Sequence, residues 1–274
     1  MNKKENLKRI AKEIRLAIIN MISEAAHGHP GGSLSCVDIL TTLYFDKMNV
    51  KPDNPKWEDR DRIVLSKGHA APALYATLAK KGYFSEKILS TLDKLGSILQ
   101  GHPDMKSTPG LDMTTGSLGQ GLSAANGMAL AGKLDKKGYR VYVILGDGEL
   151  QEGQIWEAAM TAAHYKLDNL TAILDFNGLQ IDGPNREVKN IEPVNEKFKA
   201  FGWHVIEIDG HDFDQIDKAI EEAKATKGKP TLIIAHTIKG KGVSFMENQV
   251  GWHGSAPNEE QRQKAIQELE GGGV

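Results

Sequence analysis

Residues 146–177 constrain the fold of this chain more than any other stretch. Apolar and β-branched residues fill 139–145 and 170–176, as in buried strands. Between these two runs, the apolar positions of 155–163 recur at helical spacing. A strand, a helix and a second strand form one βαβ unit. We therefore expect two parallel strands whose following loops lie at the same edge of a sheet.

Both loops of this unit carry oxygen ligands and glycines. Asp147 offers a carboxylate, Asn177 an amide oxygen, and the bent backbone near Leu179 a carbonyl. Such a set suits an octahedral Mg²⁺ that keeps positions for phosphate oxygens and water. Gly146 and Gly148 let the backbone approach a diphosphate without an intervening Cβ. An isolated Gly-Asp-Gly is more often a tight turn, but the strand–helix–strand context favours a ligand site.

The remaining periodicity predicts an α/β fold, with a mostly parallel sheet and helices on both faces. The other expected strands are 62–65, 203–208 and 230–236, which gives about five in all. Expected helices lie at 5–26, at 36–47 (capped by Ser33 or Ser35), from just after His69 to about Lys80, and from Ser85 to near Gly96. Others are expected after Gly121 and at 193–201, 214–226 and 257–270. The chain, 1–274, is expected to form a single domain whose last part, 257–274, is a polar helix and a flexible glycine tail.

Two segments before residue 146 are unusual. Residues 97–116 show little periodicity, and a loop of this length in a compact domain is usually functional or disordered. The helix that follows has alanine and glycine at most positions of 124–132. Its small side chains permit close packing on the sheet or on a partner chain, and the sequence does not decide between them.

Charge and cysteine content exclude several classes of protein. The formal net charge of −2 gives no electrostatic reason for binding nucleic acid or an anionic membrane. The single cysteine, Cys36, excludes an internal disulfide and fits a reducing compartment, where we interpret it as a packing residue. Glu5 and Glu13 interrupt the lysine-rich start, and no segment approaches the ~20 apolar residues of a membrane span. A cytoplasmic location is therefore expected.

Six ordered motifs give the chain a family resemblance. Gly146-Asp147-Gly148, followed after 28 residues by Asn177, resembles the motif that binds thiamine diphosphate through Mg²⁺ or Ca²⁺. The other five resemble transketolase signatures in the family's order, and they are Gly28-His29-Pro30-Gly31-Gly32, Lys67-Gly68-His69, Gly101-His102-Pro103, Thr114-Thr115-Gly116-Ser117-Leu118-Gly119-Gln120-Gly121 and His253-Gly254. The resemblance covers residues from about 10 to 256. It departs at the end, because a full-length transketolase continues well beyond Val274.

The resemblance implies the thiamine-diphosphate-binding fold and the transketolase reaction. That reaction moves a two-carbon ketol unit from a ketose phosphate to an aldose phosphate, as in the non-oxidative pentose phosphate pathway. The implied catalytic residues are His29, His69, His102, His253 and Glu152. The implied cofactor-binding residues are His69, Gly116, Ser117, Leu118, Gly146, Asp147, Gly148, Glu152, Asn177 and His253. The implied metal ligands are Asp147, Asn177 and Leu179.

Glu152 and Glu157 have a second interpretation. In the family, the match to Glu152 lies between two active sites and contacts the carboxylate that activates the cofactor, and Glu157 matches another acid of that network. Carboxylates in a first helical turn are equally well explained as exposed partners of the helix dipole. His27 and His211 lie outside the matched motifs and remain unassigned.

The resemblance also implies a partner. The activating glutamate, the aromatic residues that stack on the aminopyrimidine ring and the phosphate-binding arginines lie in the half that this chain lacks. The chain is therefore expected to be the N-terminal subunit of a split transketolase, assembled as α2β2 with a C-terminal, pyrimidine-binding subunit, rather than a truncation. The alternatives are the α-chain of a 2-oxo acid dehydrogenase, a 1-deoxyxylulose-phosphate synthase, and a non-catalytic binding relic.

Overall fold

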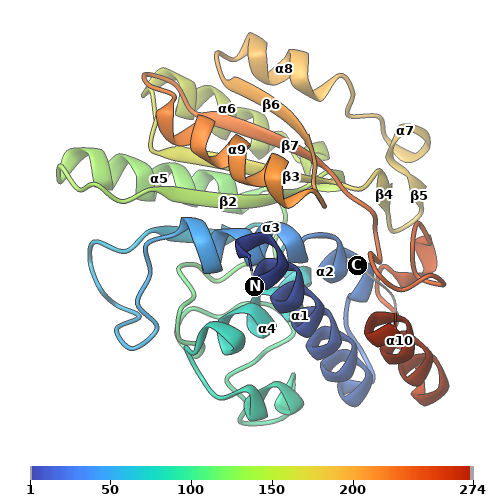
Figure 1. Cartoon of the computed structure of the whole chain (residues 1–274). Helices are drawn as coiled ribbons and strands as arrows, with labels where there is room; N and C mark the ends of the chain where they lie inside the picture. Colours follow the sequence, from blue (N-terminus) through green and yellow to red (C-terminus); the bar gives the residue numbers. More distant parts are fainter. Residues whose placement is uncertain (1, 272–274) are drawn as a thin grey trace.

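A computed structural model describes residues 2–271 of the chain. Its centre is a five-stranded sheet of order β1-β2-β3-β7-β6, in which every neighbouring pair is parallel (Figure 1). The strands are β1 (Arg62–Leu65), β2 (Val141–Gly146), β3 (Leu170–Phe176), β6 (His204–Asp209) and β7 (Thr231–His236). The prediction of a mostly parallel α/β sheet is confirmed.

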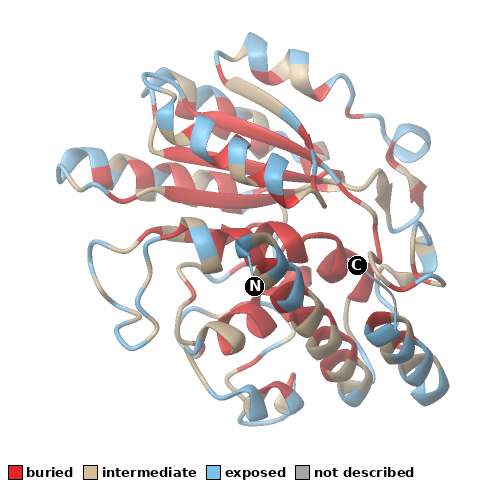
Figure 2. Cartoon of the chain, viewed as in Figure 1, coloured by how far each residue is buried: buried red, intermediate tan, exposed pale blue. Residues whose placement is uncertain are grey.

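Alternate residues of each strand face opposite sides of the sheet, which separates two hydrophobic clusters. Ile144 and Ile173 belong to one cluster, whereas Val143 and Ala172 belong to the other. The first cluster includes residues of α1 (Lys3–Ala25), α3 (Val37–Thr42), α4 (Ala71–Lys81), α9 (Phe213–Ala225) and α10 (Glu259–Gly271). The second includes residues of α5 (Gln120–Leu134), α6 (Gly153–His164) and α8 (Val194–Ala200). Strands β1, β2, β3 and β7 are accordingly mostly buried, whereas the edge strand β6 is partly exposed, and the outer helix faces are exposed (Figure 2).

The helix predicted at 36–47 is confirmed in its range, but its predicted cap by Ser33 or Ser35 is wrong. A helix already begins at Pro30 as α2 (Pro30–Ser35), turns at Cys36 and continues as α3 and a π-helical turn, Leu43–Lys47. Proline suits the first position of a helix, because an N–H at that position would have no acceptor within the helix. Ser33 and Ser35 lie inside α2, so neither caps a helix, and Ser33 Oγ instead donates to the His29 carbonyl at 2.7 Å.

The helix predicted from Ser85 to Gly96 is also wrong. Only a 3₁₀ turn, Glu86–Thr91, forms, capped by the Ser85 hydroxyl. Beyond it the Asp93 N–H donates to the Leu99 carbonyl at 2.7 Å, and Asp93 adopts a φ of 55°. These turn contacts compete with helix continuation. In contrast, residues 97–116 form no helix or strand, as their lack of periodicity predicted.

The small-sided helix α5 packs on β1, β2 and α6. At Gly121, an added Cβ would lie 2.8 Å from the Ser66 Cα, whereas at Gly127 it would meet nothing within 4 Å. We expect Gly121→Ala to lower the free energy of unfolding by about 1–3 kcal/mol through overpacking. Gly127→Ala should raise it by about 0.5–1 kcal/mol, because alanine has the higher helix propensity. Urea unfolding of both variants checks this pair, and equal effects would contradict the packing.

The rest of the chain extends the structure at its edges. A small antiparallel hairpin of β4 (Leu179–Gln180) and β5 (Gly183–Pro184) follows β3 and leads into α7 (Asn185–Val188). At the other end, α10 packs along α1. None of the helices within residues 2–271 is long and apolar enough to cross a membrane. The predicted glycine tail lies outside the described residues, except for Gly271 at the end of α10.

Candidate active site

The polar motifs meet at the carboxyl edge of the sheet. Four adjacent strands end there, and they lead directly into Ser66, Asp147, Asn177 and Thr237. This is the edge at which open α/β sheets bind ligands. A cavity of about 300 Å³ opens at this edge. Its lining includes His29, Gly32, Lys67, His69, Gly116, Leu118, Gly146, Asp147, Gly148, Glu149, Glu152, Asn177, Leu179, Lys239 and His253.

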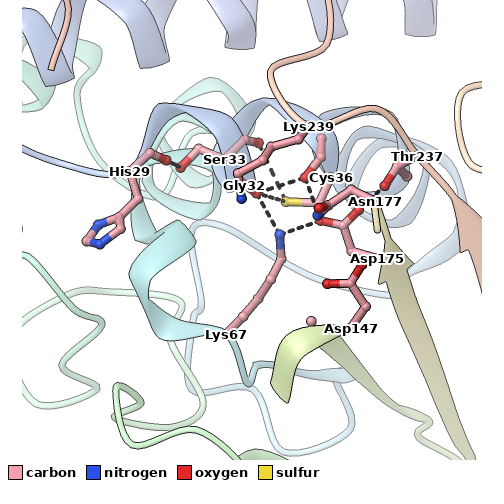
Figure 3. A network of polar contacts seen from close by, with 12 residues as sticks. His29, Gly32, Ser33, Cys36, Lys67, Asp147, Asp175, Asn177, Thr237 and Lys239 are labelled. Carbon is pink, nitrogen blue, oxygen red and sulfur yellow. Dashed lines mark hydrogen bonds and ion pairs between the residues drawn. The ribbon is translucent and has the colours of Figure 1, made fainter. Parts of the chain in front are cut away.

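Asp147 is a buried carboxylate, and among residues 2–271 no cationic side chain is in hydrogen-bond contact with it. It is 2% exposed, and its two oxygens accept the N–H groups of Gly148 at 2.8 Å and Gly178 at 2.5 Å. Burial, together with the neighbouring charge of Asp175, raises the pKa of Asp147 to about 6. Figure 3 shows Asp147 beside Asp175 and Lys67 at the base of the site. The position of Asp147 is therefore electrostatically suited to a bound cation.

The raised pKa of Asp147 predicts a pH-dependent cost in the ligand-free chain. Between about pH 4 and pH 6 the folded state binds more protons than the unfolded state, so this group lowers stability as the pH rises. A rise of the pKa to about 6 corresponds to about 3 kcal/mol. We expect the free energy of unfolding of Asp147→Asn, relative to wild type, to increase by up to that amount between pH 4 and pH 7. Chemical denaturation at several pH values measures it.

Asp182→Asn is the matched control, because Asp182 is exposed in the neighbouring hairpin. It removes an aspartate that is not buried and is measured over the same pH range. Parallel pH profiles for wild type and Asp147→Asn would contradict the assignment of a raised pKa to Asp147.

Asn177 and Leu179 follow β3 and flank Gly178, whose N–H donates to Asp147. The Asn177 Oδ1 accepts the Leu179 N–H at 3.1 Å, which forms a tight Asx turn, and both residues line the cavity. Within residues 2–271, no three carboxylate, histidine or cysteine side chains surround one metal position. A metal at Asp147 would thus need amide, carbonyl and ligand oxygens as well.

Three of the four predicted histidines form a cluster against the cavity. The ring centroids of His29, His69 and His253 lie 5.1 to 5.6 Å apart. Burial and nearby positive groups lower the pKa of all three, that of His253 to about 4 and that of His69 well below its ordinary value. They are consequently neutral at pH 7, when each ring carries one donor and one acceptor nitrogen.

His102 lies beside this cluster in an adjoining cavity of about 170 Å³. Its ring centroid is 6.5 Å from that of His29. His27 lines the same cavity, where its Nε2 lies 3.0 Å from a carboxylate oxygen of Asp93. The structure thus brings together all four predicted histidines, although they come from separate loops.

The sequence interpretation named Lys67 only as part of a motif, without a role, and it missed Lys239; both lysines are buried. Lys67 donates to the Gly32 carbonyl and to Asp175, so it joins α2 to β3 (Figure 3). Lys239 Nζ lies 3.1 Å from His253 Nδ1, and burial beside the charge of Lys67 lowers the pKa of Lys239 to about 8. The basic, glycine-containing loop after β7 was the only sequence signal for Lys239. Cys36 adjoins this network, since its Sγ lies 3.5 Å from the Gly32 carbonyl oxygen, and burial raises the pKa of its thiol to about 11.

Glu149 was missed as well, because an acid in the first turn after Gly-Asp-Gly is normally exposed. It is 2% exposed and accepts the Gly119 N–H at 2.9 Å and the Gly146 N–H at 3.0 Å, besides the Ser66 hydroxyl. It therefore joins the glycine-rich turn to the end of β2.

The other predicted site residues divide into two groups. Gly116 and Leu118 line the cavity, whereas Ser117 is exposed and lies outside the lining. Glu152 is exposed at the cavity rim, and Glu157 is exposed on α6 away from it.

The fold and the site together define a class of protein. A parallel sheet with Gly-Asp-Gly and a following Asn at its carboxyl edge is that of thiamine-diphosphate-binding domains. The family described as "Transketolase, thiamine diphosphate binding domain" matches residues 6–271. The chain belongs to the transketolase family. Its function is that of a transketolase subunit, as the sequence interpretation predicted.

Relatives that are themselves single subunits match over nearly their whole length. The 6-deoxy-6-sulfo-D-fructose transketolase subunit of Clostridium sp. (strain MSTE9) is 51% identical over 265 residues, which cover 97% of this chain and 96% of the relative. An apulose-4-phosphate transketolase subunit of Phocaeicola vulgatus is 47% identical over 265 residues, which cover 97% of this chain and 94% of the relative.

Undivided transketolases are longer. The human enzyme is 44% identical over 97% of this chain, but the match covers only 42% of the human protein. The solved structure of Campylobacter jejuni transketolase superposes with a TM-score of 0.92 at 36% identity, covering 98% of this chain and 43% of that one. The chain thus spans about two fifths of the length of these enzymes.

Proposed function

We propose that this chain is the diphosphate-binding subunit of a divided transketolase that transfers a two-carbon ketol unit from a ketose phosphate to an aldose phosphate. The observation that supports this most is the convergence of four histidines on a cavity beside Asp147 and Asn177. When bound, thiamine diphosphate supplies the carbon centre that carries the transferred unit. The chain's own residues would hold the diphosphate, orient the sugars and move protons.

The metal site we propose contains Asp147, Asn177 and the backbone carbonyl of Leu179, with Mg²⁺ or Ca²⁺ as the ion. Asp147 supports this site most directly. Burial and the nearby charge of Asp175 make its ionised carboxylate unfavourable, which raises its pKa. Bridging the carboxylate to a diphosphate through a divalent ion would remove that cost. The remaining coordination positions would take diphosphate oxygens and water.

The cofactor contacts we propose are His69, Gly116, Ser117, Leu118, Gly146, Gly148, Glu152 and His253, besides the metal ligands. Lys239 is added on structural grounds, since its ammonium lies in the cavity lining and remains mostly charged at pH 7. A lysine charge there would attract the diphosphate. Ser117 has the weakest support of this set, because its side chain is exposed.

The proton-moving residues we propose are His29, His69, His102 and His253. A neutral imidazole can accept a proton from a sugar hydroxyl at one nitrogen while it donates at the other. The lowered pKa values of His29, His69 and His253 keep these rings neutral and ready to accept. Glu152 and Glu157 are exposed, which leaves both available to groups of another chain.

The partner we propose is a C-terminal transketolase subunit that supplies the pyrimidine-binding half, in an α2β2 assembly within the cytoplasm. The names of the two closely matching relatives, which are both described as subunits, support a divided enzyme. Those relatives are named for a sulfo-sugar and for apulose 4-phosphate, so the donor and acceptor are to be sought among anionic sugars of both kinds as well as pentose phosphates.

A ketol-transfer assay with thiamine diphosphate and Mg²⁺ tests the proposal. The chain is assayed alone and mixed with the product of the adjacent gene, against sugar phosphates, sulfo-sugars and, separately, 2-oxo acids with an electron acceptor. Ketol transfer only in the mixture is expected. Ketol transfer by the chain alone would refute the need for a partner subunit. Oxidation of 2-oxo acids would refute the transketolase reaction in favour of a 2-oxo acid dehydrogenase.

A further inference from the structure

A chain of buried polar contacts links the first helix to the loop that carries Lys239. Arg15 is fully buried, and its guanidinium donates to both carboxylate oxygens of Asp38, at 3.0 and 2.6 Å. Asp38 Oδ2 also lies 2.7 Å from His211 Nδ1. On the opposite side of the ring, His211 Nε2 accepts the Ile238 N–H at 2.9 Å. Neither Arg15, Asp38 nor His211 lines the cavity.

The two partners of His211 fix its protonation. A carboxylate can only accept, so Nδ1 must carry the proton, and a backbone N–H can only donate, so Nε2 must be bare. Burial alone would raise the pKa of Asp38, but the charge of Arg15 and the hydrogen bond with His211 outweigh it and hold that pKa below its ordinary value. Asp38 is thus a charged anchor, and one tautomer of His211 satisfies both contacts.

The Ile238 amide, which His211 accepts, lies next to the cavity lining. Ile238 immediately precedes Lys239, whose ammonium reaches His253. The next residue, Gly240, donates its N–H to the Gly31 carbonyl at 3.0 Å. On its far side the loop is held by α10, where Glu268 accepts from both the N–H and the hydroxyl of Ser244. His211 therefore fixes the backbone where the loop leaves β7, one residue before the lysine of the site.

We infer that His211 is a positioning residue for the cofactor's diphosphate, acting through the Ile238 amide to place Lys239 in the cavity. The inference rests on the proposed function, because it takes the cavity as the diphosphate site. It assigns a role to a histidine that is not in the cavity lining and belongs to none of the six motifs. His211 holds the loop, and Lys239 makes the contact.

Two substitutions, His211→Gln and His211→Asn, separate a role in positioning the loop from a general contribution to fold stability. Glutamine carries its amide at about the distance of Nε2 and can still accept the Ile238 N–H, whereas asparagine reaches only the Nδ1 position and keeps the contact with Asp38. The probe is magnesium pyrophosphate, titrated calorimetrically into the full chain, since it carries the diphosphate and metal alone. His204→Asn is the control, because His204 pairs with Glu222 at the start of β6, away from the cavity.

We expect His211→Asn to weaken pyrophosphate binding about tenfold, in the range seen when a group that orients a ligand is removed. His211→Gln should retain most of the affinity, and His204→Asn should retain all of it. In the ligand-free chain, amide hydrogen exchange at residues 238–240 should accelerate in His211→Asn but not in His204→Asn. Unchanged exchange, unchanged affinity, or equal losses in the Asn and Gln variants would overturn the inference.

Two further outcomes are distinguishable. If the wild-type chain binds no pyrophosphate, the proposed diphosphate site fails, while the exchange experiment still judges the link from His211 to Ile238. If His211→Asn does not fold, ¹⁵N NMR of the wild-type His211 ring provides the test, with Nδ1 protonated and Nε2 bare as the expected result. A protonated Nε2 would overturn the inference.

Discussion

Replacing Asp147 by alanine is expected to abolish Mg²⁺-dependent binding of thiamine diphosphate and, with it, ketol transfer. The carboxylate is the single anionic side chain proposed for the metal, and the other proposed ligands are neutral oxygens. Loss of groups that merely orient a metal ligand costs about 10–100-fold in affinity, so loss of the charged ligand should cost at least about 100-fold. Calorimetric titration of the assembled enzyme with the cofactor, at fixed Mg²⁺, measures the change.

Asp182→Ala is the control for this prediction, because it removes an exposed aspartate from the adjacent hairpin. Its cofactor affinity should match that of wild type. Normal Mg²⁺-dependent affinity in Asp147→Ala would refute the metal assignment. Circular dichroism of the ligand-free variant should be unchanged, because ionisation of the buried Asp147 costs stability in the ligand-free fold at pH 7 and its removal offsets the loss of two backbone hydrogen bonds.

Replacing Lys67 by methionine is expected to destabilise the fold by about 3–5 kcal/mol, the usual cost of removing one partner of a buried ion pair. Lys67 and Asp175 have side-chain exposures of only 3% and 0%. Without the ammonium, Asp175 keeps the hydroxyls of Ser35 and Thr237, but no other cation of the described residues lies within ion-pair distance of it. Urea unfolding of the ligand-free chain measures the loss.

A second substitution separates charge from packing. In Lys67→Met/Asp175→Asn, both charges are gone, and much of the lost stability should return. The control is Lys80→Met, which breaks a pair with Glu13 that is about one-third exposed on each side and should cost about 1 kcal/mol or less. A double variant as unstable as Lys67→Met would mean that the buried charge of Asp175 is not the cause.

The sequence supplied the sheet and the location of the site, because both depend on local patterns. Strand composition around 139–145 and 170–176 identified the βαβ unit, and the rule for parallel sheets then placed Asp147 and Asn177 at one edge. The histidines were found by resemblance to a family and not by spacing. The neutral state of His29, His69 and His253 at pH 7 follows only from burial and neighbouring charges in the folded chain.

The functional residues that the sequence did not reveal are those whose partners lie far away along the chain. Lys67 and Asp175 are separated by 108 residues, and His211 and Asp38 by 173. A lysine or histidine in a loop is normally solvated, and only the fold reveals that these are buried beside a carboxylate. Glu149 was overlooked for the same reason, since its burial depends on the glycine-rich turn that arrives from 30 residues upstream.

The alternation of the strands limits how this chain can change in length during evolution. In β3, Ile173 and Asp175 face the side of the sheet where Ser35 lies, and Leu174 faces the other. Deletion or insertion of one codon within that strand would turn a leucine or phenylalanine toward Lys67 and place Asp175 in the opposite apolar cluster. Gaps should thus be found in the loops between helices, whereas the segment from Leu170 to Asn177 should keep a constant length in active variants.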